Sequence, residues 1–266
     1  MSEQAQARDD QRYRVEAVTR AVRLLKELRK GPLPLAEIAA NAEVPANFAA
    51  HALETLARNG LARAQGETRG LGETWGLGLS WLKIADARSR QIDLRELALP
   101  IMRHMRDEVD ETVILCVRRG LRRVNIDYVE STQAIRRVTQ HGYESPLHIG
   151  AAGRALLCGL SEDEVGDYFA QATSSTARDA KLLQVATYIQ ELSGVRTKGY
   201  AQVSGEMTPD TAAVSAPVFD HTAQVIGALT ISAPSDRFMP QLEASCIATI
   251  KKGAMDLSLM LGYSPA

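Results

Sequence analysis

The sequence predicts an α+β protein in two parts, a small helical front module and a larger rear domain built on an antiparallel sheet. Three observations lead to this prediction. The chain has 266 residues, about 1.8 times the length of an average domain. Before residue 60, apolar residues recur every three or four positions, which is the helical period. After residue 110 the period changes, and β-rich runs separated by turn residues predict strands.

The front module contains three helices and a hairpin. The first helix is predicted over residues 13–30 and the second, shorter one over residues 35–41. Pro45 opens the third, because proline is accommodated at the first helical position, and an Asn-Gly pair ends it. Two short strands over residues 61–64 and 74–79 follow. Three helices followed by a two-stranded hairpin are the layout of a winged helix-turn-helix.

The rear domain follows a helical stretch that we interpret as a linker. Asp93 begins the next helix, with Glu96 three residues on, as in a capping box. Strands are predicted over residues 112–117, 123–129, 134–139, 211–219 and 225–232. Helices are predicted over residues 151–159, 161–171, 181–193 and 241–261. The predicted parts are a flexible tail (1–12), the winged helix-turn-helix (13–80), the linker helix (81–92) and the rear α+β domain (93–266).

Composition excludes several classes of protein. Apolar residues make up 45% of the chain and charged residues 24%, which argues against a disordered or fibrous protein. No apolar run approaches the ~18 to 20 residues of a membrane helix. The polar N-terminus, which carries acids, is unlike a signal or transit peptide. We therefore expect a cytoplasmic protein without a membrane segment.

The charges are distributed unevenly along the chain. Residues 1–90 hold 14 Lys and Arg against 11 Asp and Glu, whereas residues 91–266 hold 17 against 21. A basic front module suits docking on phosphate. Ordinary variation among solvated side chains would give the same mild asymmetry.

The sequence carries no signature of an enzyme. Its three cysteines are widely spaced without a C-x-x-C, so neither a disulfide framework nor a zinc ribbon is predicted. The five histidines have no metal-binding spacing, and no P-loop, H-E-x-x-H or G-x-S-x-G occurs. Asp220 and His221, near Ser215, have the residue types of a hydrolytic triad, but a turn between strands explains the pair more simply. We expect no catalysis, no metal and no cofactor.

Motifs along nearly the whole chain, roughly residues 15–262, resemble the IclR family of bacterial transcriptional regulators. The front carries VTRAVRLL (18–25), LAEIA (35–39) and WGLG (75–78). The rear carries DLRELALPIM (93–102), ETVILCV (111–117), PLH followed by AAGRALL (146–157), KGYA (198–201) and SAPVFDHTAQVIGALTISAP (215–234). Such proteins join a winged-helix DNA-binding domain to a GAF-like effector-binding domain and act as dimers or tetramers. The resemblance implies a repressor or activator that binds operator DNA and responds to a small organic acid or its derivative.

The resemblance also implies the residues of the effector pocket. They are Ala134, Arg137, Tyr143, Leu147, Ala151, Ala152, Val203, Ala213, Thr230 and Ser232. Many relatives carry an acid-rich stretch where this chain has Val203, Ser204 and Gly205, and a cysteine in place of Ala213. We therefore expect a less polar and roomier pocket that accepts an aromatic or otherwise flat acid, or its amide or hydrazide.

Several of these residues allow more than one interpretation. The small residues from Gly150 onward let a ligand approach a helix start, whose free N–H groups attract an anion. Tight packing of the helix on the sheet is the other interpretation. Thr230 and Ser232 present hydroxyls on one strand face, for the ligand, for each other or for water. Arg137 can pair with the ligand or with an acid such as Glu206, or it can lie solvated at a sheet edge.

The residues expected at DNA are Arg20, Arg23, Asn47, Phe48, His51, Arg63 and Arg69. Asn47 can reach an adenine edge or a phosphate, and His51 a phosphate. Phe48 can face a thymine methyl group or the core. The arginines are expected to anchor phosphates, although each can be ordinary solvated charge.

Two alternatives to a DNA-binding regulator stay open. The third helix has no basic residue before Arg58, so one alternative is a small-molecule sensor that does not read bases. The other is a hydrolase on a GAF-like scaffold. For a regulator, the front module is too small to span two half-sites ~34 Å apart, so a dimer is expected through residues 13–30 and the linker helix.

Overall fold

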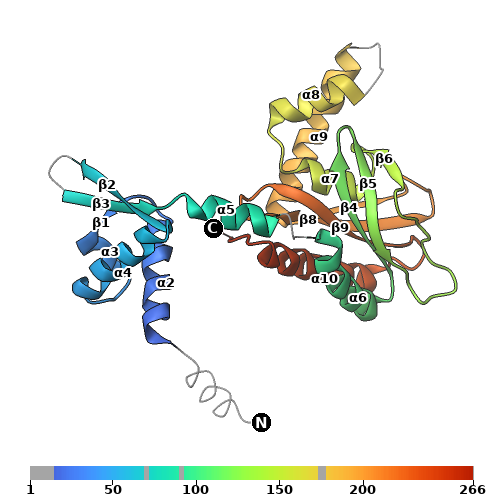
Figure 1. Ribbon diagram of the computed structural model, residues 1–266. Helices are drawn as coiled ribbons and strands as arrows, with labels where there is room; N and C mark the ends of the chain where they lie inside the picture. Colours follow the sequence, from blue (N-terminus) through green and yellow to red (C-terminus); the bar gives the residue numbers. More distant parts are fainter. Residues whose placement is uncertain (1–14, 69–71, 90–92, 173–177, 266) are drawn as a thin grey trace, which may run out of the picture. The chain divides into compact units, whose positions relative to one another are not determined.

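The computed structural model describes residues 15–68, 72–89, 93–172 and 178–265. The chain divides into two compact units, Met1–Ile92 and Asp93–Ala266, and Figure 1 shows the elements of each. Among the described residues, no helix combines the length and the apolar character needed to cross a membrane.

The first unit is a winged helix-turn-helix. Its helices are α2 (Glu16–Leu28), α3 (Leu35–Asn41), α4 (Ala46–Arg58) and α5 (Ser80–Ser89). Its strands are β1 (Leu33–Pro34), β2 (Ala62–Thr68) and β3 (Gly72–Leu77), which pair antiparallel in the order β1-β3-β2. Pro45 is the N-cap of α4 rather than its first helical residue, and Gly60 follows the helix with a φ of 71°. The predicted three helices and hairpin are confirmed, with β1 as an addition.

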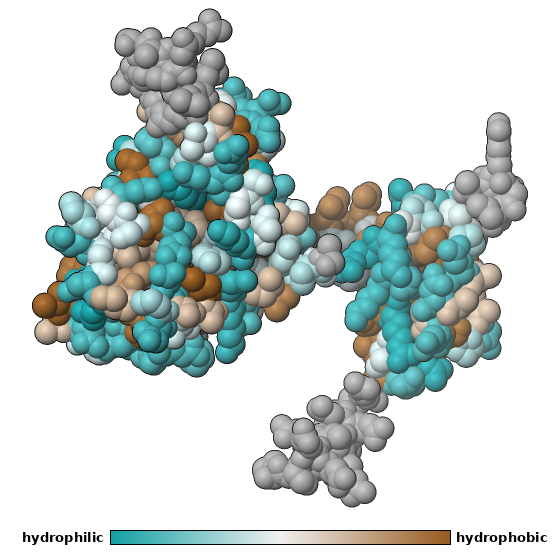
Figure 2. Space-filling model, turned by 180° about the vertical axis from the view of Figure 1, so that it is seen from behind, coloured by the Kyte–Doolittle hydropathy of each residue, from teal (hydrophilic) through white to brown (hydrophobic). Residues whose placement is uncertain are grey.

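Helix α2 is buried only toward its C-terminal end. Leu24 and Leu28 lie in the core of the first unit, whereas Val15, Val18 and Val22 are exposed. The three valines lie near one face of the helix, because residues three and four apart are neighbours. The face of this unit seen in Figure 2 is otherwise largely hydrophilic. The described residues of the first unit therefore leave these three valines uncovered.

The second unit contains a six-stranded antiparallel sheet in the order β6-β5-β4-β9-β8-β7. The strands are β4 (Thr112–Arg119), β5 (Arg122–Val129), β6 (Glu144–Pro146), β7 (Ala201–Ser204), β8 (Thr211–Phe219) and β9 (Val225–Pro234). The two edge strands, β6 and β7, are short and were not predicted. Short strands carry too few alternating residues for their period to show in the sequence.

The strand predicted over residues 134–139 is wrong, because this stretch is a connection between β5 and β6. Side-chain hydrogen bonds fix this connection, and they replace the backbone hydrogen bonds that a strand would make. Thr112 Oγ1 donates to the carbonyl oxygen of Arg137 at 2.7 Å, and Asn125 Nδ2 donates to Thr139 Oγ1 at 2.8 Å. Tertiary contacts thus override the β-propensity of the stretch.

Helices cover both faces of the sheet (Figure 1). Helices α6 (Leu94–Val109) and α10 (Pro240–Met260) pack together and cover one face. On the other face, α7 (Gly150–Leu157) lies against the sheet, with α8 (Glu162–Ala172) and α9 (Arg178–Lys198) beyond it. Asp93 is the N-cap of α6, where it accepts a hydrogen bond from the Arg95 N–H. Ser161 and Glu164 exchange the two bonds of a capping box at the start of α8.

Candidate functional site

The second unit contains a cavity between α7 and the sheet. Its volume is about 50 Å³, which is room for a few water molecules. Most of the residues expected at the effector line it, namely Arg137, Tyr143, Ala151, Ala152, Val203, Ala213, Thr230 and Ser232. Two do not. Ala134 is exposed in the β5–β6 connection, and Leu147 is buried in the core cluster of this unit.

The small residues of α7 have two different surroundings. Gly150, Ala151 and Ala152 line the cavity. Gly153 instead lies so close to the backbone of Leu147 that a Cβ added there would collide with the Leu147 carbonyl oxygen. The first turn of the helix therefore borders a cavity, and the next residue allows close packing.

A carboxylate of the chain itself occupies the start of α7. The backbone N–H of Gly150 donates to Glu206 Oε2 at 2.8 Å, and Arg154 pairs with Glu206 at 2.7 Å and with Glu191 at 2.8 Å. Burial raises the pKa of Glu206, but the hydrogen bonds from Arg154 and Gly150 outweigh it and hold that pKa below its usual value. The Gly150 N–H at this helix start is therefore already bound by a carboxylate of the chain.

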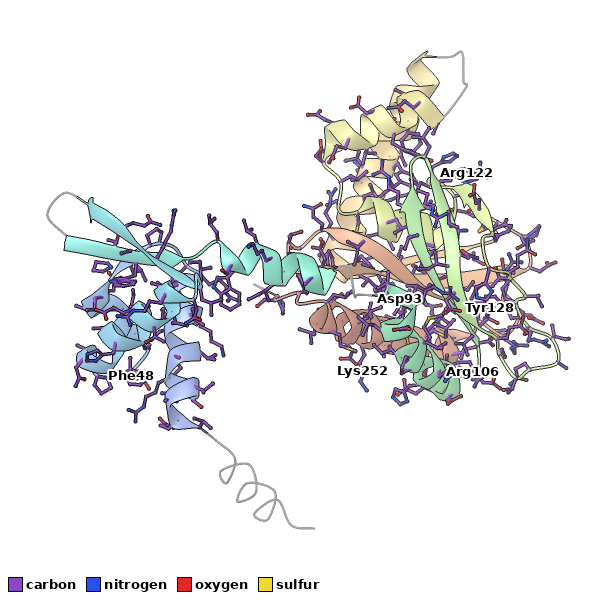
Figure 3. All side chains as sticks on the ribbon, in the orientation of Figure 1. Phe48, Asp93, Arg106, Arg122, Tyr128 and Lys252 are labelled. Carbon is purple, nitrogen blue, oxygen red and sulfur yellow. The ribbon has the colours of Figure 1, made fainter. Side chains whose placement is uncertain are left out.

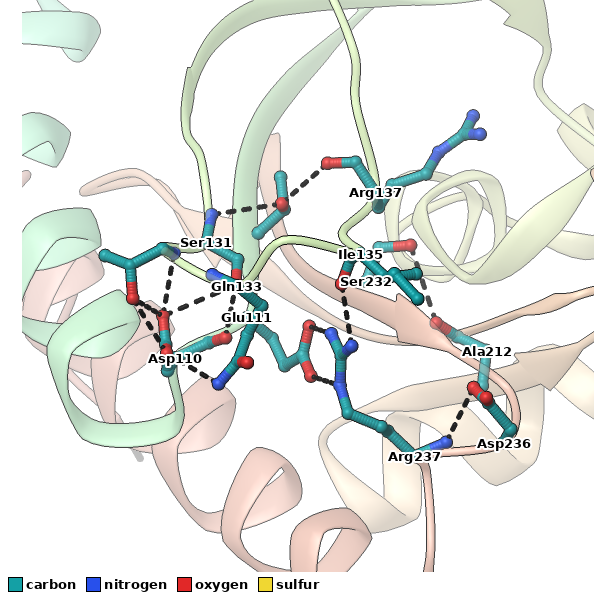
Figure 4. A network of polar contacts seen from close by, with 12 residues as sticks. Asp110, Glu111, Ser131, Gln133, Ile135, Arg137, Ala212, Ser232, Asp236 and Arg237 are labelled. Atoms are coloured by element: carbon teal, nitrogen blue, oxygen red, sulfur yellow. Dashed lines mark hydrogen bonds and ion pairs between the residues drawn. The ribbon is translucent and has the colours of Figure 1, made fainter.

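Of the alternatives considered for Arg137, a pairing with Glu206 is not observed, because Arg154 takes that carboxylate. The backbone of Arg137 is held by Thr112, while its half-buried side chain lines the cavity. Figure 4 shows this side chain extending away from the ion pair that joins Glu111 and Arg237. Arg137 therefore presents its charge at the cavity.

The sequence prediction missed several polar residues of the cavity. Arg123 and Asn125 on β5, Thr139 in the connection, and Glu206 also line it. Arg123 is 6% exposed and Asn125 is 2% exposed. Their two-residue spacing puts both on one face of β5, which is the signal that could have found them. The cavity thus contains charged and amide side chains in addition to the residues expected there.

The two strand hydroxyls at the cavity already have partners in the sheet. Thr230 Oγ1 lies 2.9 Å from Ser215 Oγ, and Ser232 Oγ donates to the carbonyl oxygen of Ala212 at 3.5 Å. The first of these bonds is close and the second is long for a hydroxyl donor. Ser232 is therefore the freer of the two for a bound molecule.

The three residues of the possible hydrolytic triad have separate roles. Ser215 is fully buried in β8 and donates to the carbonyl oxygen of Leu229 at 2.7 Å. Asp220 caps the β8–β9 turn by accepting hydrogen bonds from the N–H groups of Thr222 and Gln224. Because strand residues rise about 3.3 Å each, five positions along the strand hold the serine far from this turn. The arrangement gives no serine–histidine–aspartate geometry at these positions.

Helix α4 of the first unit presents a polar face at its N-terminal turns. Asn47 and His51 are exposed. Phe48 is half-buried against the core of the unit (Figure 3), and the Arg20 guanidinium lies 5.7 Å from the centre of its ring. The core interpretation of Phe48 is therefore the one that the structure supports. Arg20 also pairs with Glu16 at 2.9 Å.

The remaining predicted DNA contacts lie around this helix. Arg23 on α2 and Arg63 on β2 are exposed. Arg69 lies outside the described residues. Asn47, His51, Arg23 and Arg63 are therefore accessible hydrogen-bonding or charged side chains of the first unit.

Comparison with protein families accounts for both units. Residues 17–66 match the IclR helix-turn-helix domain, and residues 87–259 match the bacterial transcriptional regulator IclR C-terminal domain. The chain is 30% identical over 174 residues to the HTH-type transcriptional regulator KipR of Bacillus subtilis, covering 65% of this chain and 70% of that protein. It is 26% identical over 252 residues to the transcriptional repressor IclR of Escherichia coli, covering 93% and 90%.

Solved structures agree on the fold. A putative IclR transcriptional regulator from Silicibacter sp. superposes with a TM-score of 0.77 at 19% identity, over 95% of this chain and 98% of that one. HmgR of Pseudomonas aeruginosa superposes with a TM-score of 0.73 at 24% identity, over 92% and 98%. With a helix-turn-helix in the first unit, a cavity under α7 in the second and family matches along both, this chain belongs to the IclR family of bacterial transcriptional regulators.

Proposed function

We propose that this chain binds operator DNA through α4 and the arginines around it, and that a small organic acid or its derivative in the cavity changes the affinity for DNA. The observation that carries the proposal is the cavity under α7, whose lining holds Arg123 and Arg137. Positive side chains in a largely enclosed site favour an anion. The relative from Escherichia coli is named a repressor, and we propose repression for this chain, acting in the cytoplasm.

The size of the cavity bears on the kind of acid. From the sequence we expected an aromatic or otherwise flat molecule. A volume of about 50 Å³ is small beside the several hundred Å³ of a typical drug-sized pocket. We therefore propose a compact acid in place of an aromatic one.

Binding to the DNA upstream of the chain's own gene tests the first half of the proposal. In a gel-shift titration at several salt concentrations, Arg23→Ala should weaken binding to all sequences and flatten the salt dependence, because each phosphate contact releases counterions. Asn47→Ala should instead relax the preference for the operator over unrelated DNA. Equal, weak binding of the wild type to every sequence would favour the sensor that does not read bases.

The exposed stripe of α2 supports a dimer as the DNA-binding form. Val15, Val18 and Val22 on α2, and Leu82 on α5, are exposed in the single chain. Covering such side chains is favourable by about 25 cal/mol for each Å² removed from water. Light scattering at micromolar concentration should give at least a dimer, and Val18→Glu should shift it toward monomer. A monomeric wild type would contradict the proposal.

The acid can act on DNA binding only if it has unequal affinity for two arrangements of the protein. Helix α5 (Ser80–Ser89) is the last helix of the first unit, and we propose that it transmits the difference. The same titration, repeated with candidate acids, measures the coupling as the change in DNA affinity.

A further inference from the structure

Arg123 is a buried cation without a counterion in the described part of the chain. It is 6% exposed, and its Nε atom has no hydrogen-bond partner there. Its Nη2 atom meets the sulfur of Met207 at 2.6 Å. A thioether is a weak acceptor and brings no charge. Burying a guanidinium in this way is costly unless an anion pairs with it.

The other charges at the cavity do not supply that anion. Glu206 is the acid that lines it, and its two oxygens are held by Arg154 and by the Gly150 N–H. Arg137 adds a second positive charge. The described lining therefore carries more positive than negative charge.

Asn125 supplies a second unpartnered group. It is 2% exposed, and its Nδ2 atom is bound to Thr139, while its Oδ1 atom has no partner among the described residues. An amide oxygen accepts, so it needs an O–H or N–H donor. Arg123 and Asn125 stand two positions apart on β5, so their Cα atoms are about 7 Å apart on one face of the strand. One short molecule can reach both side chains.

We propose that the effector is a compact hydroxy-carboxylate, whose carboxylate binds Arg123 and whose hydroxyl donates to Asn125 Oδ1. The inference rests on the proposed function and names the class of its ligand. A carboxylate gives Arg123 the bidentate partner that it lacks. A hydroxyl suits Asn125 better than an ammonium group does, because an ammonium would lie beside two arginines. A ligand of this size matches a cavity of about 50 Å³.

A panel of small probes on the full-length protein tests the class of ligand. Glycolate and lactate should raise the melting temperature, since a ligand of the native state stabilises it. Propionate lacks the hydroxyl and should bind roughly tenfold more weakly, the cost of one unmade hydrogen bond to a buried acceptor. Lactamide, which lacks the charge, and alanine, which carries an ammonium, should give no shift. No shift with either hydroxy acid, or equal shifts with lactate, propionate and lactamide, would overturn the inference.

Arg123→Met tests the role of the cation. Calorimetry with lactate should show affinity lower by roughly 100-fold, because a charge-assisted pair is lost. The melting temperature of the ligand-free variant should equal or exceed that of the wild type, because an uncompensated buried charge has been removed. Arg122→Met is the matched control, since Arg122 (Figure 3) is exposed and pairs with Glu144 at 3.0 Å. Unchanged affinity in Arg123→Met, or failure of that variant to fold, would show that Arg123 is structural and would overturn the inference.

Asn125→Leu tests the hydroxyl. This variant should bind lactate and propionate equally, and a preserved preference for lactate would exclude Asn125 as the acceptor. The gel shift without any probe separates this inference from the proposed function. If the wild type binds its upstream DNA but no hydroxy acid, only the ligand class is wrong. If it binds lactate through Arg123 but no DNA, the ligand class stands and the regulatory function fails.

Discussion

The two faces of the six-stranded sheet are covered in different ways. Helices α6 and α10, of 16 and 21 residues, close one face over fully buried side chains such as Met102 and Leu257. Helix α7, of 8 residues, leaves a cavity at the other face, with buried polar atoms of Arg123 and Asn125 unpartnered among the described residues. The two faces of one sheet are thus covered by helices that differ in length and in the size of their residues.

The largest effect should come from truncating a side chain on the closed face. Leu257→Ala should lower the free energy of unfolding by about 2 to 5 kcal/mol, because it removes buried methyl groups and leaves a void. Urea unfolding followed by circular dichroism measures the loss. Leu259→Ala is the control on the same helix, since Leu259 is 50% exposed, and it should change the free energy by less than about 0.5 kcal/mol. Equal losses of unfolding free energy in the two variants would mean that packing of α10 on the sheet does not stabilise the fold.

Substitutions at two neighbouring alanines on β8 allow a direct comparison of the two faces of the sheet. Ala213 lines the cavity, whereas Ala212 is buried and lies on the opposite face of the strand. Ala212→Leu should lower the free energy of unfolding by about 1 to 3 kcal/mol through overpacking. Ala213→Leu should cost less, because it enters open space, and should abolish the melting-temperature shift caused by a bound acid. If Ala213→Leu lowered the free energy of unfolding more than Ala212→Leu, the cavity would have to lie on the other face of the sheet.

The smallest effect should come from the carboxylate at the start of α7. Its lowered pKa means that Glu206 stabilises the fold above the unfolded pKa of about 4.3 and that this contribution is lost as the pH falls through the folded value. Because the side chain is 34% exposed, Glu206→Gln should cost less than about 1 kcal/mol at neutral pH. Urea unfolding at neutral and at acidic pH should show the difference between wild type and variant shrinking in acid. A difference that grows in acid would contradict this account of Glu206.

Much of the fold could be predicted from local patterns. The helical period, the Asn-Gly stop after α4, the N-cap at Asp93 and the capping box at Ser161 act within a few residues, so they are readable in the chain. The connection over residues 134–139 could not be predicted, because its backbone is held by Thr112 and Asn125 from other strands. Local propensity favoured a strand there, and distant partners decided otherwise.

At the candidate site, too, some features could be predicted from the sequence and others could not. Ala151, Ala213 and Thr230 could be placed at a pocket by resemblance, but the partners of the charged residues could not. Glu206 pairs with Arg154 and not with Arg137, because a turn more than 50 residues away brings its carboxylate to α7. Arginine is usually solvated, so the residue type of Arg123 did not indicate that its side chain is buried.

The amino-acid sequence by itself determined the elements, the helix-turn-helix layout and the membership in a family, because these depend on short-range spacing and on motifs. Only the tertiary structure decided which polar side chains are buried and which of them have partners. That outcome depends on which strands become neighbours and on where a short helix leaves space. For this protein, the difference separates Arg154, which pairs with Glu191 and Glu206, from Arg123, whose Nε atom has no partner among the described residues.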